Sequence, residues 1–153
     1  MLPAPKTWIE VSRSALRANA ATLKRLAGRG VSFVAVVKSN AYGHGIPQVV
    51  RSLRSSADWY GVDSIDEAVT VRAAGAKQPV PILGYTLEGR LKEAVDRGFR
   101  LTVYNDATIR RLAKVATAKK PARVHVKIET GTSRQGVLAD DLLPFVARAR
   151  RNK

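Results

Sequence analysis

Cysteine is absent from the 153-residue chain, and histidine occurs only twice. Without cysteine the chain cannot form a disulfide framework, a cysteine-ligated zinc site or an iron–sulfur cluster. His44 and His125 are too few for a site built from several imidazole ligands, so we expect no metal. No apolar run approaches the roughly 18 residues of a membrane-spanning helix, and residues 1–8 lack the apolar segment of a secretory signal. We therefore expect a soluble, cytoplasmic chain of about one domain, with no membrane partner.

Acidic residues are scarce relative to basic ones, since 27 Lys and Arg oppose 12 Asp and Glu and give a net charge of +15. This excess has two interpretations: a surface that binds nucleic acid, or a basic proteome or a fragment that lacks its acidic remainder. The basic residues are spread along the chain, and the one dense tract, residues 148–153, has no interleaved aromatics for base stacking. Nucleic-acid binding is therefore the less favoured alternative.

The chain repeats one supersecondary unit, a strand-like apolar run followed by a helix-like stretch. Consecutive runs start 20 to 27 residues apart and lie at Ser32–Ser39, Trp59–Ser64, Pro79–Tyr85, Leu101–Asn105 and Arg123–Thr130. Helices are expected at Arg13–Ala27, Asp66–Ala74, Asp106–Ala118 and Asp140–Arg150. Strands that alternate with helices are typical of βαβ units and a parallel sheet.

Local signals agree with this alternation. Ser64 followed by Glu67 forms a capping box at the start of a helix. Gly30, Gly75 and Gly98 stand just before strands, where a helix needs a left-handed residue to end.

Two architectures consist of such units, the doubly wound open sheet and the (β/α)8 barrel. No G-x-G-x-x-G follows the first strand, which weakens the dinucleotide-binding version. In the last strand the apolar and polar residues fall on opposite faces, Val124, Val126 and Ile128 against His125, Lys127 and Glu129. A buried parallel strand is apolar on both faces, so the polar face indicates either a barrel interior or a solvated edge strand. We expect an α/β fold, a partial TIM-type barrel of about five βα units.

The segment Val36–Gly45, VVKSNAYGHG, is the first candidate site. Lys38 ends an apolar strand, at the end of the sheet where active sites of parallel α/β folds lie. A lysine amine that loses hydration there becomes a nucleophile, and the Tyr42 hydroxyl can donate to an anion such as phosphate. The residues alone leave a second interpretation open, a lysine that reaches solvent above a glycine-rich turn.

This segment resembles the cofactor-lysine motif of the alanine racemase family, fold type III enzymes that use pyridoxal 5′-phosphate (PLP). The resemblance implies that Lys38 bonds covalently to PLP and acts as one catalytic base, and that Tyr42 contacts the cofactor phosphate. It implies no catalytic role for His44, which we expect to hold the turn by a hydrogen bond.

The segment Lys127–Gly136, KIETGTSRQG, is similar to the second signature of the same family. The resemblance implies that Arg134 approaches both the phenolic oxygen of PLP and the substrate carboxylate. It also implies that Lys127 can be carbamylated and then orient Arg134. Thr132 stands where the family usually has Met, and Glu129 stands where it usually has Asp. These two differences bear on the shape of the pocket and on the choice of substrate.

A weaker likeness lies at Thr7–Val11, which matches the short strand that opens the family's barrel. The resemblance then implies an enzyme that interconverts L- and D-alanine, supplies D-alanine for peptidoglycan, and acts as a homodimer. A barrel has eight strands and the chain has five, so we expect residues 1–153 to be the N-terminal part, without the C-terminal barrel half and the β-domain. That domain supplies the family's second base, a tyrosine, so the fragment alone is expected to be inactive.

Two alternatives remain open at this point. One is a non-catalytic PLP-binding protein of the same fold group, which lacks the β-domain. The other is the basic nucleic-acid-binding module. Of the remaining segments, we expect Trp59–Val62 to fill the core, and Leu83 and Gly84 to end a strand on the same rim as Lys38.

Overall fold

The computed structural model describes residues 6–151, and their elements alternate as βα units. The strands are β1 (Val34–Val36), β2 (Trp59–Gly61), β3 (Pro81–Ile82), β4 (Arg100–Val103) and β5 (Arg123–Val126). The helices are α1 (Arg13–Ala27), α2 (Lys38–Tyr42), α3 (Ile46–Leu53), α4 (Ile65–Ala73), α5 (Leu91–Asp96), α6 (Asp106–Val115) and α7 (Leu142–Arg151), with 3-10 turns η1 (Glu88–Arg90) and η2 (Ala139–Asp141). None of the helices in the described range is long and apolar enough to cross a membrane.

The five strands are parallel and follow one another in space in chain order. β1 pairs with β2, and β3, β4 and β5 form a continuous ladder. A parallel bridge between Val62 and Ile82 joins the two groups, and the Tyr60 N–H donates to the Pro79 carbonyl at 3.1 Å. The sequential order is that of a barrel wall.

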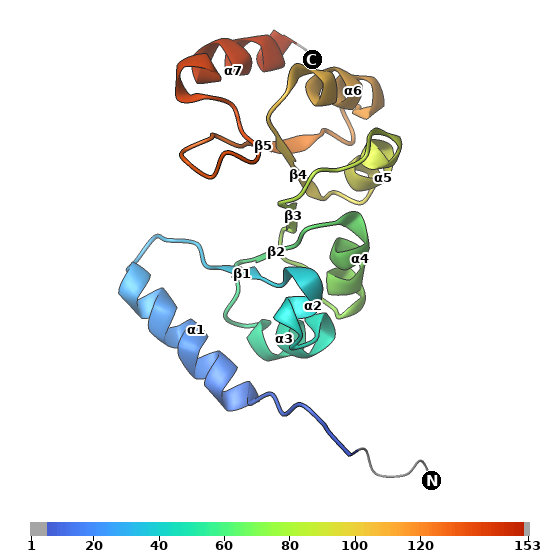
Figure 1. The fold of residues 1–153 in the computed structure, drawn as a ribbon. Coiled ribbons are helices and arrows are strands. Elements are labelled where there is room, and N and C mark those ends of the chain that lie inside the picture. The colour runs from blue at the N-terminus through green and yellow to red at the C-terminus, as the bar shows by residue number, and fades with distance from the viewer. Residues whose placement is uncertain (1–5, 152–153) are drawn as a thin grey trace.

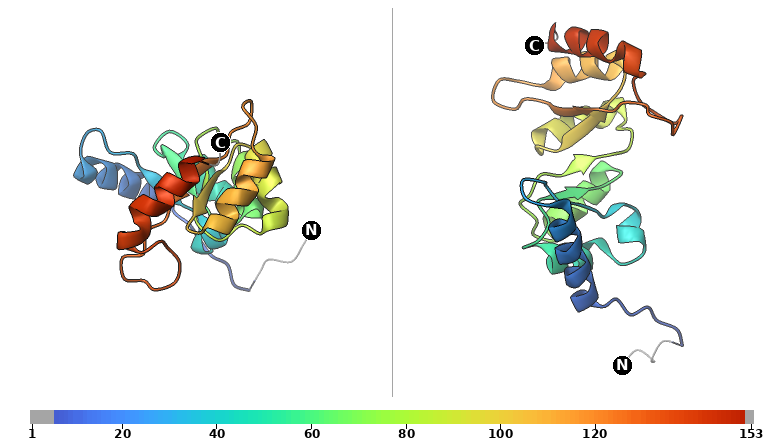
Figure 2. Two further views of the ribbon diagram at one scale, coloured as in Figure 1. Left: turned by 90° about the horizontal axis from the view of Figure 1, so that it is seen from above. Right: turned by 90° about the vertical axis from the view of Figure 1, so that its left-hand side faces the viewer.

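The crossover helices cover a single face of this wall. In Figure 1, α4, α5 and α6 lie along one side of the column of strands, α3 lies below β1 and β2, and α1 and α7 flank the two ends. The right-hand view in Figure 2 shows the same elongated arrangement, with α1 towards one end and α7 at the other. A doubly wound sheet would carry helices on both faces, so the structure confirms the expected partial barrel.

Strand alternation divides the side chains between the two faces. The residues that point to the helices are almost fully buried: Ala35, Val37, Tyr60, Val62, Val80, Ile82, Leu101 and Val103. Burying a Val, Leu or Ile side chain contributes about 1.5–3 kcal/mol each, so this layer is the main source of stability. Tyr60 fits there because its hydroxyl donates to the Val50 carbonyl at 3.1 Å, and burial raises the pKa of Tyr60.

Side-chain caps fix where the helices begin. Ser12 accepts from the Ala15 N–H at 3.2 Å at α1, and Asn105 accepts from the Thr108 N–H at 2.8 Å at α6. Each cap satisfies a backbone donor that has no partner inside the helix. Together with the positive φ of the glycines that follow α4 and α5, these caps keep the βα connections short.

Some expectations from the sequence were wrong in detail. Residues 7–11 form no strand; Trp8 and Ile9 are 66% and 81% exposed, because no neighbouring strand offers them a ladder. α1 ends at Ala27 as expected, but Gly28 rather than Gly30 is its C-cap, and α6 ends at Val115, three residues early. The basic tract lies on α7, except Lys153, which is outside the described residues.

Candidate functional site

Lys38 stands where β1 ends and the chain turns away from the sheet. The last ladder bond of this edge runs from the Val37 N–H to the Gly61 carbonyl, at 2.8 Å. Lys38 is half-buried, whereas Ser39 and Asn40 after it are exposed. The residue singled out from the sequence thus occupies the carboxyl end of a strand, where parallel α/β folds place their reacting groups.

The turn after Lys38 is left-handed. Ser39, Asn40, Ala41 and Tyr42 all have φ between 52° and 55°. A left-handed conformation costs about 1–2 kcal/mol for each residue with a side chain, so four in succession require compensation from their surroundings.

Hydrogen bonds supply part of this compensation. The Ala41 N–H donates to the Val37 carbonyl at 2.8 Å, and the Gly45 N–H donates to the Asn40 carbonyl at 2.9 Å. The Asn40 side chain accepts from the Ile46 N–H at 3.0 Å, at the start of α3. These bonds anchor the turn between β1 and α3.

His44 has the role expected from the sequence. Its Nδ1 lies 3.0 Å from the Ala41 carbonyl, which can only accept, so Nδ1 carries the proton of this bond. The bond connects the end of the turn to its middle, and the expected structural function of His44 is confirmed.

The open face of the sheet contains a hollow of about 430 Å³. Its lining includes Trp59, Leu83, Thr102, His125 and Lys127, which come from four different strands or their ends. The polar face of β5 therefore looks into the concave side of the wall, as the barrel interpretation of its alternation requires. β5 is at the same time the edge strand of the described sheet, and its first three residues are exposed, so the edge-strand interpretation also holds within residues 6–151.

Two residues that line this hollow, Trp59 and His125, belong to an aromatic and cationic cluster. The Arg100 guanidinium stacks over the Trp59 ring at 4.3 Å, and the His125 ring meets the same indole edge-on at 5.8 Å. Burial, followed by the charge of Arg100, lowers the pKa of His125. The lowered pKa favours the neutral form of the His125 ring, although the residue is exposed on the open face of the sheet.

The loop after β5 is organised by Glu129. The Gly131 N–H donates to Glu129 Oε1 at 2.5 Å, while the Glu129 N–H and the Val137 carbonyl pair at 2.8 Å. The backbone N–H of Ser133, then that of Gly131, lowers the pKa of the Glu129 carboxyl. The hydrogen bond from Gly131 and the lowered pKa together indicate that the Glu129 carboxylate helps to hold the loop that carries Arg134.

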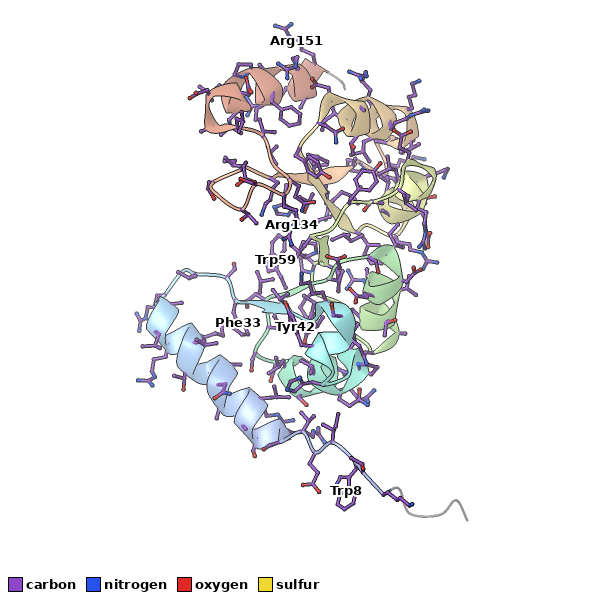
Figure 3. All side chains as sticks on the ribbon, in the orientation of Figure 1. Trp8, Phe33, Tyr42, Trp59, Arg134 and Arg151 are labelled. Carbon is purple, nitrogen blue, oxygen red and sulfur yellow. The ribbon has the colours of Figure 1, made fainter. Side chains whose placement is uncertain are left out.

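The candidate residues form two groups. Lys38 and Tyr42 share the left-handed turn, with Tyr42 61% exposed; Lys127 and Arg134 lie on either side of Glu129, with Arg134 exposed. Figure 3 shows Arg134 in the loop beside the strands, on the same side of the wall as Trp59. Within residues 6–151, no hydrogen bond or ion pair joins one group to the other, although both belong to carboxyl ends of strands in one sheet.

Sequence reasoning missed one residue of this site. Glu67 was recognised only as part of a capping box, and Ser64 does accept from its N–H at 3.3 Å. Its carboxylate, however, accepts from the Ser39 N–H at 2.6 Å and the Asp63 N–H at 2.8 Å. Nothing in the sequence pairs residues 28 positions apart, so only the structure shows this contact.

Residues 11–153 match the family described as "Alanine racemase, N-terminal domain". The chain belongs to the alanine racemase family. The two motifs indicated this family from the sequence, and the match confirms the resemblance over almost the whole chain.

Named alanine racemases are similar to this chain in sequence. The Symbiobacterium thermophilum enzyme is 37% identical over 133 residues, which cover 86% of this chain and 35% of the relative. Alanine racemase 1 of Oceanobacillus iheyensis is 38% identical over 136 residues, 88% of this chain and 36% of the relative. The chain thus spans little more than a third of the length of these curated alanine racemases.

Solved alanine racemase structures share the fold. The Clostridium difficile 630 enzyme superposes with a TM-score of 0.85 at 26% identity, over 92% of this chain and 38% of that one. The Bacillus anthracis enzyme with bound L-Ala-P also has a TM-score of 0.85, at 27% identity, over 97% and 40%. The five parallel strands correspond to part of an alanine racemase barrel.

Proposed function

We propose that this chain is the part of an alanine racemase that holds PLP and supplies one of the two bases for the interconversion of L- and D-alanine. The observation that carries the proposal is the position of Lys38. It is half-buried at the carboxyl end of β1, on an anchored turn, within a motif of the matched family. An amine held in this way is suited to bond with the cofactor aldehyde.

The donors present fit a phosphorylated aldehyde. Lys38 offers an amine, Tyr42 an exposed hydroxyl for the phosphate, and Arg134 an exposed guanidinium for oxygens of cofactor and substrate. PLP, when bound, withdraws electron density from the α-carbon of the amino acid. The chain contributes orientation and a base, because Lys38 would take or return the proton at that carbon.

Lys127 would act on Arg134 rather than on the substrate. Addition of CO2 to its deprotonated amine, with release of a proton, would replace the cation by a carbamate anion, which can accept a charge-assisted hydrogen bond from a guanidinium. The shared loop supports this pairing, since the backbone carbonyl of Lys127 accepts from the Val137 N–H at 2.8 Å at the base of the loop that carries Arg134.

The remaining parts of the proposal follow from the family. We propose alanine as the substrate, a homodimer as the functional assembly, the cytoplasm as the location, and D-alanine supply for peptidoglycan as the role. The second base would be the tyrosine that alanine racemases place on their C-terminal β-domain. Residues 1–153 would form the N-terminal part of the barrel.

Covalent trapping tests the proposal. The chain is incubated with PLP, reduced with borohydride and digested, and the labelled lysine is identified by mass spectrometry. We expect the label on Lys38 and its loss in Lys38→Ala, with an unchanged far-UV circular dichroism spectrum. Lys114→Ala, at an exposed lysine of α6, is the matched control and should retain the label on Lys38. Equal total labelling of Lys38→Ala and the parent chain would overturn the assignment.

A further inference from the structure

At the carboxyl ends of β1 and β2, one backbone hydrogen bond of the parallel ladder is missing. A side chain joins the two strand ends in its place. In this register the Asp63 N–H would continue the parallel ladder by donating to the Val37 carbonyl. That carbonyl instead accepts from the Ala41 N–H at 2.8 Å, inside the left-handed turn. The Asp63 N–H donates to Glu67 Oε2 at 2.8 Å.

The same carboxylate also holds the first residue of the turn. Glu67 Oε1 accepts from the Ser39 N–H at 2.6 Å. Ser39 has φ of 53° and directly follows Lys38, so the peptide between them is tied to the end of β2. Hydrogen bonds to a charged acceptor are roughly twice as strong as neutral ones.

We propose that Glu67 is a positioning residue for Lys38: its carboxylate replaces the ladder between β1 and β2, holds the left-handed turn in place and so sets the direction in which Lys38 leaves the sheet. The inference deepens the proposed function and rests on it for the role of Lys38. Glu67 itself touches neither cofactor nor substrate in this assignment.

Only a carboxylate satisfies both donors. A glutamine has one carbonyl oxygen to accept a hydrogen bond, and its NH₂ group would face the second N–H donor. Glu67→Gln therefore removes one of the two ties and leaves the cap at Ser64, which uses the Glu67 backbone. This variant separates the positioning role from the helix cap.

Asp66 provides the matched control. It is the neighbouring acid in the first turn of α4, and its side chain is 77% exposed and paired with Arg90 at 2.9 Å. Asp66→Asn removes one negative charge from the same helix end, as Glu67→Gln does, without touching the turn of Lys38. Exposed ion pairs contribute little, so this control should fold normally.

Two measurements test the proposal on the chain as it exists. The first is amide hydrogen exchange of Ser39 and Asp63 by NMR, without any cofactor. Loss of one charge-assisted bond should speed exchange of these amides about tenfold in Glu67→Gln and leave it unchanged in Asp66→Asn. The second is PLP labelling with borohydride, in which the label on Lys38 should fall relative to other lysines in Glu67→Gln alone.

The outcomes separate the two proposals. Rapid exchange of both amides in the unsubstituted chain would overturn the role of Glu67 even if the variant failed to fold. Unchanged exchange or unchanged Lys38 labelling in a folded Glu67→Gln would overturn it as well. If instead the parent chain is not labelled on Lys38, the proposed function fails, while the exchange data still decide whether Glu67 holds the turn.

Discussion

At the scale of single residues, the carboxylate of Glu129 helps to order the loop that carries Arg134. It stands where alanine racemases usually have Asp, one methylene shorter. Its carboxyl group accepts from the backbone of the loop that carries Arg134, and these donors lower its pKa. The longer side chain is therefore compatible with an ordered loop, and the departure from the family pattern does not remove this acceptor.

The lowered pKa of Glu129 makes the loop sensitive to acid. Its stabilisation is complete above the pKa of a glutamate in an unfolded chain, about 4.3, and is lost as the pH falls through the lower pKa of the folded state. We expect the amide signals of Gly131 and Ser133 to shift towards random-coil values below about pH 4 in an NMR titration. Glu129→Gln should remove this pH dependence, and Glu88→Gln, at an exposed acid, should not. A titration that is unaltered in Glu129→Gln would contradict the assignment.

At the scale of elements, the return of the chain after β5 depends on Gly136. Its φ is 151°, and a Cβ there would lie 2.5 Å from the backbone nitrogen of Glu129. The pairing of Glu129 with Val137 brings these two segments together at 2.8 Å. No side chain fits between the segments unless the backbone moves.

Gly136→Ala should therefore lower the free energy of unfolding by about 1–3 kcal/mol. The measurement is the midpoint of urea-induced unfolding, which should fall. Gly89→Ala is the control, because a Cβ at Gly89 meets nothing within 4 Å and its φ is not positive. The control should be neutral or slightly stabilising. Equal midpoints for Gly136→Ala and the parent would show that the loop adjusts freely.

At the scale of the whole molecule, the wall of five strands has two open edges. Val34 and Val36 of β1 are 41% and 42% exposed, and Val124 of β5 is 39% exposed. Open strand edges are templates for pairing with another chain. A hollow of about 590 Å³ beside β5, lined by apolar residues of α6 and α7, adds unpaired apolar surface at one of these edges.

We expect the polypeptide of residues 1–153 to self-associate, with a sedimentation coefficient that rises with concentration in analytical ultracentrifugation. Val124→Lys places a charge at the β5 edge and should weaken association. Leu143→Lys, at a residue of α7 that is 79% exposed, is the control and should not. A compact monomer at high concentration would argue against exposed barrel edges.

The same polypeptide should show no more than residual alanine racemisation. Lys38 supplies one base, and loss of a positioned acid or base typically costs about 10²–10⁴-fold in rate. We expect the C-terminal portion of a relative, such as the Symbiobacterium thermophilum enzyme, to restore part of the activity when added in trans. The measurement is D-alanine formation from L-alanine with excess PLP, with and without this portion. Full turnover by residues 1–153 alone would refute the assignment of two bases.

Much of the architecture could be predicted from the sequence, because it depends on interactions between residues close together in the chain. The alternation of apolar runs with capped helices predicted five parallel βα units, and the pattern in β5 predicted which side chains face inward. Lys38 could be placed at a strand end because the apolar run stops there. These features follow from periodicity and capping, which act over a few residues.

Other features depend on contacts between residues far apart in the chain. Nothing local predicts four left-handed residues in Ser39–Tyr42, because that conformation is unfavourable for each of them and persists only through contacts from α3 and from Glu67. The hollow beside Lys127 exists because residues of separate strands meet on one concave face. Non-local hydrogen bonds and packing outweigh local preference at these positions, and the candidate site lies where they do so.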